Sequence, residues 1–157
     1  MANPVDLLPA NLQNTLHEII QRANACGGAI RVILLSTAEG VPLGRAYSST
    51  DRETPLNEEV LSNIESTWAP ASKQFPLLNM GKEVKIVTAI YDQRTIFHVY
   101  QAPVVVTILV GMNANLGAIR STAIPLLKQT LEPLCTTLLN SLSPPVDHPY
   151  PQQGYYQ

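Results

Sequence analysis

Two stretches of the chain are almost wholly apolar and show no alternation of apolar and polar positions. One spans residues 103–110 (Pro-Val-Val-Val-Thr-Ile-Leu-Val) and the other spans residues 29–35. A strand with apolar side chains on both sides must be covered on both faces, so these stretches predict the two central strands of one sheet. Because they lie far apart in the sequence, we expect a five-stranded mixed sheet with helices packed on it.

Three further segments are typical of strands, namely Val41–Tyr47, Glu83–Tyr91 and Thr95–Gln101. Pro42 cannot donate a hydrogen bond to a neighbouring strand, which places the first of these at an edge. The turn residues 92–94 predict a hairpin between the other two segments, and hairpin connectivity places Thr95–Gln101 beside the central strand. The predicted strand order is therefore 2-1-5-4-3, with Glu83–Tyr91 at the second edge.

Apolar residues recur at helical spacing in three segments, which gives the element order α-β-β-α-β-β-β-α and an α/β (α+β) fold class. The stripes are Leu12, Leu16, Ile19, Ile20 and Ala23; Val60, Leu61, Ile64, Trp68 and Ala71; and Leu127, Leu131, Leu134, Leu138 and Leu142.

Local signals predict where these helices begin and end. Gly27-Gly28 ends the first, and Thr54 is the expected N-cap of the second, with Pro55 as its first residue. The third helix falls between Leu116 and Leu142. Pro125 either kinks this helix or marks a second start, capped by Ser121 or Thr122.

The length of 157 residues indicates one domain with flanking segments. Residues 1–10 form a lead-in, residues 11–142 the domain, and residues 143–157 a tail that we expect to be disordered. The tail holds four prolines, three tyrosines and three glutamines, which leaves little apolar bulk to pack.

The chain is poor in charge. Charged residues make up 14% of it, against about a quarter in ordinary domains, and the net charge is −2. No cluster of Lys and Arg is present, which argues against nucleic-acid binding. A signal peptide, a membrane-spanning stretch and a myristoylation glycine are all missing, so we expect a cytoplasmic protein that reaches membranes only through partners, without inserting directly.

No residue pattern predicts catalysis, a metal site or a cofactor. His17, His98 and His148 lack metal-ligand spacing, and His98 on a strand is expected to be structural. Gly81-Lys82 does not belong to a phosphate-binding loop. Cys26 and Cys135 are expected to be buried free thiols, with a disulfide between them as the alternative.

Four short motifs resemble, in the same order, those of the roadblock (dynein light chain) family, whose fold is related to profilin and longin domains. The likeness is greatest to the branch that supplies a MEK-partner scaffold to the late endosomal and lysosomal adaptor, the Ragulator complex. It covers residues 25–140, although the segment 117–133 is longer than in the family pattern. The motifs are Glu39-Gly40-Val41-Pro42-Leu43, Ala102-Pro103-Val104-Val105-Val106, Ala114-Asn115-Leu116-Gly117 and Leu131-Glu132-Pro133-Leu134.

The resemblance implies a non-catalytic adaptor that works by pairing. Roadblock domains join their third strands edge to edge and pack their second helices together. A heterodimer with a second roadblock subunit (a subunit 2 homologue) is implied, wrapped by a lipid-anchored subunit on late endosomes and lysosomes. This assembly holds Rag GTPases for amino-acid-dependent activation of target-of-rapamycin complex 1, and a scaffold role for MEK and ERK kinases is implied as well.

The residues support pairing independently, because the outer side of Glu83–Tyr91 has no partner in the predicted order and offers a template for another strand. Trp68 and Phe75 are the natural aromatic anchors, although Trp68 could instead fill the core. The predicted partner-binding residues are Leu61, Ile64, Trp68, Phe75, Val84, Ile86, Thr88 and Ile90.

Two other functions stay open at this point. The first is a homodimeric roadblock light chain of dynein or a regulator of another small GTPase. The second is a ligand-sensing domain on a profilin-like sheet, which would need polar groups that converge in a pocket.

Overall fold

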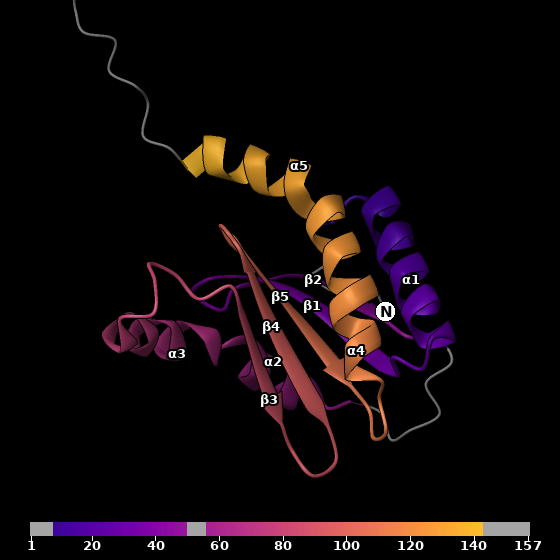
Figure 1. Ribbon diagram of the computed structural model, residues 1–157. Helices are drawn as coiled ribbons and strands as arrows, with labels where there is room; N and C mark the ends of the chain where they lie inside the picture. Colours follow the sequence, from indigo (N-terminus) through magenta and orange to yellow (C-terminus); the bar gives the residue numbers. More distant parts are fainter. Residues whose placement is uncertain (1–7, 50–55, 143–157) are drawn as a thin grey trace, which may run out of the picture.

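The computed structural model describes residues 8–49 and 56–142. Five strands form one sheet of order β2-β1-β5-β4-β3, as predicted, with helices on both faces (Figure 1). The strands are β1 (Ile30–Thr37), β2 (Pro42–Tyr47), β3 (Ile86–Ile90), β4 (Thr95–Gln101) and β5 (Val104–Val110). The helical segments are α1 (Ala10–Ala25), α2 (Glu58–Glu65), α3 (Trp68–Gln74), the 3-10 turn η1 (Phe75–Leu78), α4 (Leu116–Ala118), the π-helical segment η2 (Ile119–Ala123) and α5 (Ile124–Leu142).

All neighbouring strands run antiparallel, so the mixed sheet expected from the sequence is wrong. Parallel neighbours need a crossover connection of a dozen or more residues between them. The crossover that carries α2 and α3 joins β2 to β3, and these strands lie at opposite edges of the sheet. The long connection therefore spans one face without making any adjacent pair parallel.

One face of the sheet carries the main core, covered by α1, η2 and α5 (Figure 1). Large apolar side chains from β1, β5 and β4 meet those of the helices there and are fully or almost fully buried. They include Ile33, Leu35, Phe97, Val106 and Ile108 from the strands, and Leu16, Ile20, Ile119, Leu127 and Leu131 from the helices.

The C-terminal helical segments α4, η2 and α5 follow one another without a break, so a second helix start near Pro125 is wrong. The Asn115 side chain caps the beginning by accepting a hydrogen bond from the Ala118 amide, whereas the Ser121 hydroxyl donates to the Gly117 carbonyl. The π-helical segment η2 ends two residues before Pro125. Proline has no amide hydrogen to donate to the preceding turn, and the wider hydrogen-bond spacing of η2 changes the register of the helix just before it. Figure 1 shows α5 bending partway along, and Pro133 lies inside it.

The opposite face is covered by α2, whose Leu61 forms a small buried cluster with Val32, Leu34 and Leu109 of the strands. Asn57 is the N-cap of α2 and accepts a hydrogen bond from the Glu59 amide. The predicted cap at Thr54 and Pro55 lies outside the described residues. The single predicted helix is instead two, because α2 ends at Glu65 and α3 begins at Trp68.

A buried ion pair fixes α2 to the edge strand β2. The Arg45 guanidinium donates from Nε and Nη2 to the two carboxylate oxygens of Glu65, each at 3.0 Å, and it also pairs with Glu58. Burial alone would lower the pKa of Arg45, but the hydrogen bonds to Glu65 and Glu58 outweigh burial and raise the pKa. The guanidinium therefore stays charged and sets the position of the end of α2.

Replacing one partner of this pair should destabilise the fold, because the other charge would remain buried without compensation. We expect Glu65→Gln to lower the free energy of unfolding by about 3 kcal/mol in urea denaturation. The matched control is Glu58→Gln, whose side chain is 63% exposed and which should cost less than about 1 kcal/mol. Equal losses in the two variants would contradict the assignment of Glu65 as the anchor.

Candidate partner-binding surface

The two edges of the sheet differ in how they are covered. At β2, the Gln13 side chain on α1 donates a hydrogen bond of 3.0 Å to the Arg45 carbonyl, and Leu8 packs so closely on Gly44 that a Cβ there would overlap it. At the other edge, β3 pairs with β4 on one side, and among the described residues no strand pairs with its outer side. The open edge therefore lies at β3.

The hydrogen bonds that flank β3 identify its outward backbone groups. The Tyr100 amide donates to the Lys85 carbonyl at 2.9 Å, and the Tyr91 amide donates to the Arg94 carbonyl at 2.8 Å. In an antiparallel pair, successive residues point their backbone groups alternately toward and away from the partner. The amides and carbonyls of Ile86, Thr88 and Ile90 therefore face away from β4, where another strand could bind them.

A groove of about 330 Å³ lies beside this edge, between α2–α3 and strands β3–β4. Most of its lining side chains are apolar, and Val60 and Tyr91 are 43% and 62% exposed. The lining residues are Val60, Asn63, Ile64, Thr67, Trp68, Ala71, Val87, Ala89, Tyr91, Ile96 and His98. The open edge and the groove together form a continuous candidate surface, which we call the pairing surface.

The predicted binding residues divide into two groups. Leu61 is fully buried against Val32 and Leu34 and does not line the groove, whereas Trp68 is only 3% exposed but contributes to the groove wall. Trp68 stacks on Tyr100 with ring centroids 5.5 Å apart, which supports the alternative that it fills the core.

The other six predicted residues keep accessible surface. They are Ile64, Phe75, Val84, Ile86, Thr88 and Ile90, and Ile90 is 71% exposed. Only Ile64 lines the groove, whereas the side chains of Ile86, Thr88 and Ile90 lie on the opposite face of β3 from those of Val87 and Ala89. Their role in partner binding stays a prediction.

The groove also contains Val87, Ala89, Tyr91 and Ile96, which were not among the predicted binding residues. Strand alternation places Val87 and Ala89 on the opposite face from Ile86 and Thr88, and this alternation can be read from the sequence. The predicted binding residues of the edge strand all lie on one of its two faces. Ile96 could not be identified in this way, because its place in the groove depends on where α2 crosses the sheet.

His98 of β4 lines the groove and has the structural role predicted for it. Its Nδ1 is 2.9 Å from the Thr107 hydroxyl on β5, and its Nε2 is 3.1 Å from the Thr67 hydroxyl at the break between α2 and α3. Burial lowers the pKa of His98 to about 4, so the imidazole is neutral and has one donor and one acceptor nitrogen. These two bonds hold the helix break against the sheet.

The described residues offer little other chemistry. Among them, no group of three His, Cys, Asp or Glu side chains could hold a metal ion, and no helix has the length and apolar character needed to span a membrane. Cys26 and Cys135 are not bonded to each other. Cys135 is buried as expected, and burial raises the pKa of its thiol, but Cys26 is exposed and the expectation that it is buried is wrong.

Comparison with known proteins gives one family match and several structural likenesses. The family model described as "Mitogen-activated protein kinase kinase 1 interacting" matches residues 10–140. A comparison with curated proteins finds no match for the sequence.

The similar solved structures are distant in sequence. The gliding protein MglB of Thermus thermophilus has a TM-score of 0.64 and 12% identity, over 87% of this chain and 99% of that one. A Roadblock/LC7 domain of Streptomyces avermitilis has a TM-score of 0.58 and 10% identity, over 76% and 97%. MglB of Myxococcus xanthus has a TM-score of 0.58 and 15% identity, over 85% and 98%. These likenesses show a roadblock fold.

The lowered pKa of His98 predicts a loss of stability in acid. Between pH 6.5 and 4 the unfolded chain binds a proton at His98 that the folded chain does not, so the free energy of unfolding should fall by up to about 3 kcal/mol as the pH drops through this window. Denaturation at a series of pH values should show this slope in the wild type and a shallower slope in His98→Gln. Equal slopes in the wild type and in His98→Gln would contradict the prediction.

Proposed function

Because the chain belongs to the mitogen-activated protein kinase kinase 1 interacting family and has the roadblock fold, we propose that it is a non-catalytic scaffold subunit that pairs with a second roadblock domain. The observation that carries this proposal is that one edge of the sheet is covered and the other is open. The edge at β2 is covered by α1 and Leu8, whereas β3 offers unpaired backbone groups beside an apolar groove.

Strand addition at β3 accounts for both features of the pairing surface. A partner strand would satisfy the outward amides and carbonyls of Ile86, Thr88 and Ile90, and it would extend the sheet beyond its present edge. A helix or apolar segment that follows that strand would then lie over the groove. Together the edge and the groove could supply the roughly 800 Å² per partner that a standard interface buries.

The assembly we propose is the Ragulator complex. In it, this chain and a homologue of subunit 2 form the heterodimer, and a lipid-anchored subunit holds the pair on the cytoplasmic side of late endosomes and lysosomes. The pair would bind Rag GTPases during amino-acid-dependent activation of target-of-rapamycin complex 1. The family description names an interaction with mitogen-activated protein kinase kinase 1, which supports a scaffold role for MEK and ERK kinases as well.

The test blocks the open edge without disturbing the fold. Thr88→Pro removes one outward amide and keeps the bonds of Val87 and Ala89 to β4, because edge strands tolerate proline where the amide faces outward. Affinity purification of the tagged full chain from its own cells, read by mass spectrometry, should recover a second roadblock-fold chain with the wild type. Thr88→Pro should recover at least about tenfold less of it, a loss of about 1.4 kcal/mol.

The control variant Thr88→Val keeps the amide and should bind as the wild type does. Thermal unfolding of all three proteins checks that the edge substitution leaves the domain folded. Undiminished recovery with Thr88→Pro would contradict pairing through β3. Recovery of no roadblock-fold chain by the wild type would contradict the proposed function itself, as would companions typical of dynein or of another small GTPase.

A further inference from the structure

The segment that leads from α2 towards β3 projects from the domain as an arm, which comprises residues 68–82. It contains α3, η1 and the four residues that follow, and Figure 1 shows it extending away from the sheet. Leu77, Leu78 and Met80 on this arm are 74%, 61% and 89% exposed. The backbone beyond them is open, because a Cβ added at Gly81 would meet no other described atom within 4 Å. Clusters of large exposed apolar side chains are typical of sites that contact proteins or membranes.

Aromatic packing holds the root of the arm on the sheet. Trp68 at the start of α3 stacks on Tyr100 of β4, and the Trp68 and Phe75 ring centroids lie 6.4 Å apart. Burial raises the pKa of Tyr100, and the charges of Glu83 and Glu39 raise it further, so these two carboxylates lie near the root. The arm is therefore a fixed element whose outer part carries the exposed apolar side chains.

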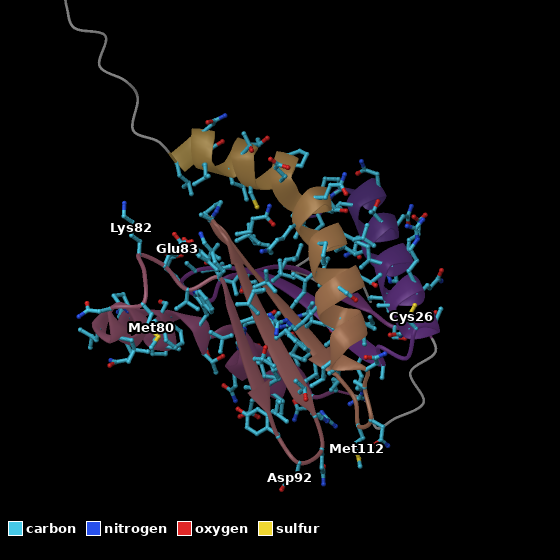
Figure 2. The ribbon with its side chains drawn as sticks, in the orientation of Figure 1. Cys26, Met80, Lys82, Glu83, Asp92 and Met112 are labelled. Carbon is cyan, nitrogen blue, oxygen red and sulfur yellow. The ribbon has the colours of Figure 1, made fainter. Side chains whose placement is uncertain are left out.

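The charges of the arm are positive. Residues 66–82 include no Asp or Glu, whereas Lys73 and Lys82 lie on either side of the apolar residues in the sequence, and both are exposed. Figure 2 shows the Lys82 side chain directed away from the strands. Glu83, the next residue, pairs with Lys85 at 3.1 Å, and among the described residues neither Lys73 nor Lys82 has an ion-pair partner. The arm thus carries two uncompensated positive charges in a chain whose net charge is −2.

An anionic membrane surface fits this combination better than a protein does. A stable protein interface buries roughly 800 Å² on each side, which three side chains on a projecting segment do not supply. None of these three side chains lines the groove beside β3. A membrane requires neither a large area nor a shaped recess. Apolar side chains enter the boundary between headgroups and acyl chains, and each nearby lysine adds attraction to anionic headgroups.

We infer that the arm is a membrane contact.

In this contact, Leu77, Leu78 and Met80 enter the headgroup boundary of an anionic bilayer, and Lys73 and Lys82 lie against the headgroup charges. The contact is superficial and reversible, because a few apolar side chains and two lysines give only weak attachment by themselves. It goes beyond the pairing function proposed above and does not use β3. Within the proposed assembly it would orient the domain on the membrane to which the lipid-anchored subunit is attached, so the expectation that the chain reaches membranes only through partners would be incomplete.

Vesicle flotation of the purified full chain measures the apolar part of the contact. The vesicles contain equal parts of phosphatidylcholine and phosphatidylserine, and vesicles of phosphatidylcholine alone, which should bind less of the chain, are the uncharged comparison. We expect Leu77→Ser/Leu78→Ser/Met80→Ser to lower the partition coefficient onto the anionic vesicles at least about tenfold. The matched control, Met112→Ser/Leu142→Ser, removes side chains that are 60% and 69% exposed at other places and should bind as the wild type does.

A second pair of variants measures the charged part. Lys73→Ala/Lys82→Ala should lower the same partition coefficient by up to about thirtyfold, because each lysine near an anionic surface contributes separately. The control Arg22→Ala/Arg120→Ala removes two exposed positive charges from α1 and η2 and should keep wild-type binding. In about 1 M salt, which screens charges beyond about 3 Å, the lysine variant and the wild type should bind equally.

Fluorescence quenching locates the contact on the arm. In a Cys26→Ser background, where the remaining Cys135 is buried, a fluorophore is attached to Met80→Cys. Anionic vesicles whose lipids carry bromine on their acyl chains should quench this fluorophore. The same fluorophore on Met112→Cys, which Figure 2 shows far from Met80, is the control and should not be quenched.

The outcomes separate a membrane from a protein as the occupant, and the inference from the proposed function. A wild-type chain that does not bind anionic vesicles, or a triple serine variant that binds them equally well, would overturn the inference. A triple serine variant that keeps vesicle binding but loses a companion in affinity purification would overturn it too, because the arm would then contact a protein.

Thr88→Pro leaves the arm in place and should bind vesicles as the wild type does. Loss of vesicle binding in Thr88→Pro would place the contact at β3 and overturn the arm as its site. Failure of the arm variants to change vesicle binding leaves the pairing function intact, because that function is read separately from the recovery of a second roadblock-fold chain.

Discussion

The two central strands β1 and β5 are buried on both faces, and the rest of the structure depends on how unequally the chain covers those faces. On one side, α1, η2 and α5 provide a broad apolar surface over the main core. On the other side the cover is α2, a helix of eight residues whose Leu61 packs on three buried side chains of the sheet, Val32, Leu34 and Leu109. Apolar contact alone is therefore a weak determinant of where α2 and α3 lie.

On the face that α2 covers, polar contacts determine where α2 and α3 lie. Arg45 of β2 holds Glu65 at the end of α2, and His98 of β4 holds Thr67 at the break that follows. A buried ion pair adds little net stability over apolar packing, but its geometry is strict, so it fixes one arrangement among several that apolar packing would allow. With the break anchored, α3 leaves the sheet in a set direction, and the space between the helices and β3–β4 stays open as the groove.

The parts of this architecture that are encoded locally could be predicted from the sequence. The apolar segments at 29–35 and 103–110 identify the central strands, Pro42 identifies an edge, and the hairpin turn at 92–94 orders the remaining strands. Strand direction depends on which strands the long crossover connects, and the expected mixed sheet is wrong because this crossover joins the two edge strands. The break at residues 66–67 follows from contacts with Arg45 and His98, which are distant in sequence.

The candidate site, too, could be predicted only where it depends on local sequence. The edge strand was predictable because it needs only the strand order, but the apolar stripe over residues 60–71 cannot show which of its residues face the chain's own sheet. Leu61 and Trp68 turned inward, and Val60 of the same stripe faces outward. The groove is formed jointly by α2, α3 and two strands, so no local pattern contains it. The partner-binding role of the accessible residues remains a prediction from the open edge.

The chemistry of the two edges gives an independent reason to regard β3 as a surface that another chain completes. Proteins protect free sheet edges with prolines, charged residues, bulges or covering segments. The edge at β2 has Pro42, Arg45, an irregularity opposite Leu35 and Ser36, and a cover from α1. Between Ile86 and Ile90 the sequence is Ile-Val-Thr-Ala-Ile, which has neither charge nor proline, and its pairing with β4 is regular. An edge left unprotected in this way would promote nonspecific association in a solitary chain, so its chemistry is suited to a strand that is normally paired.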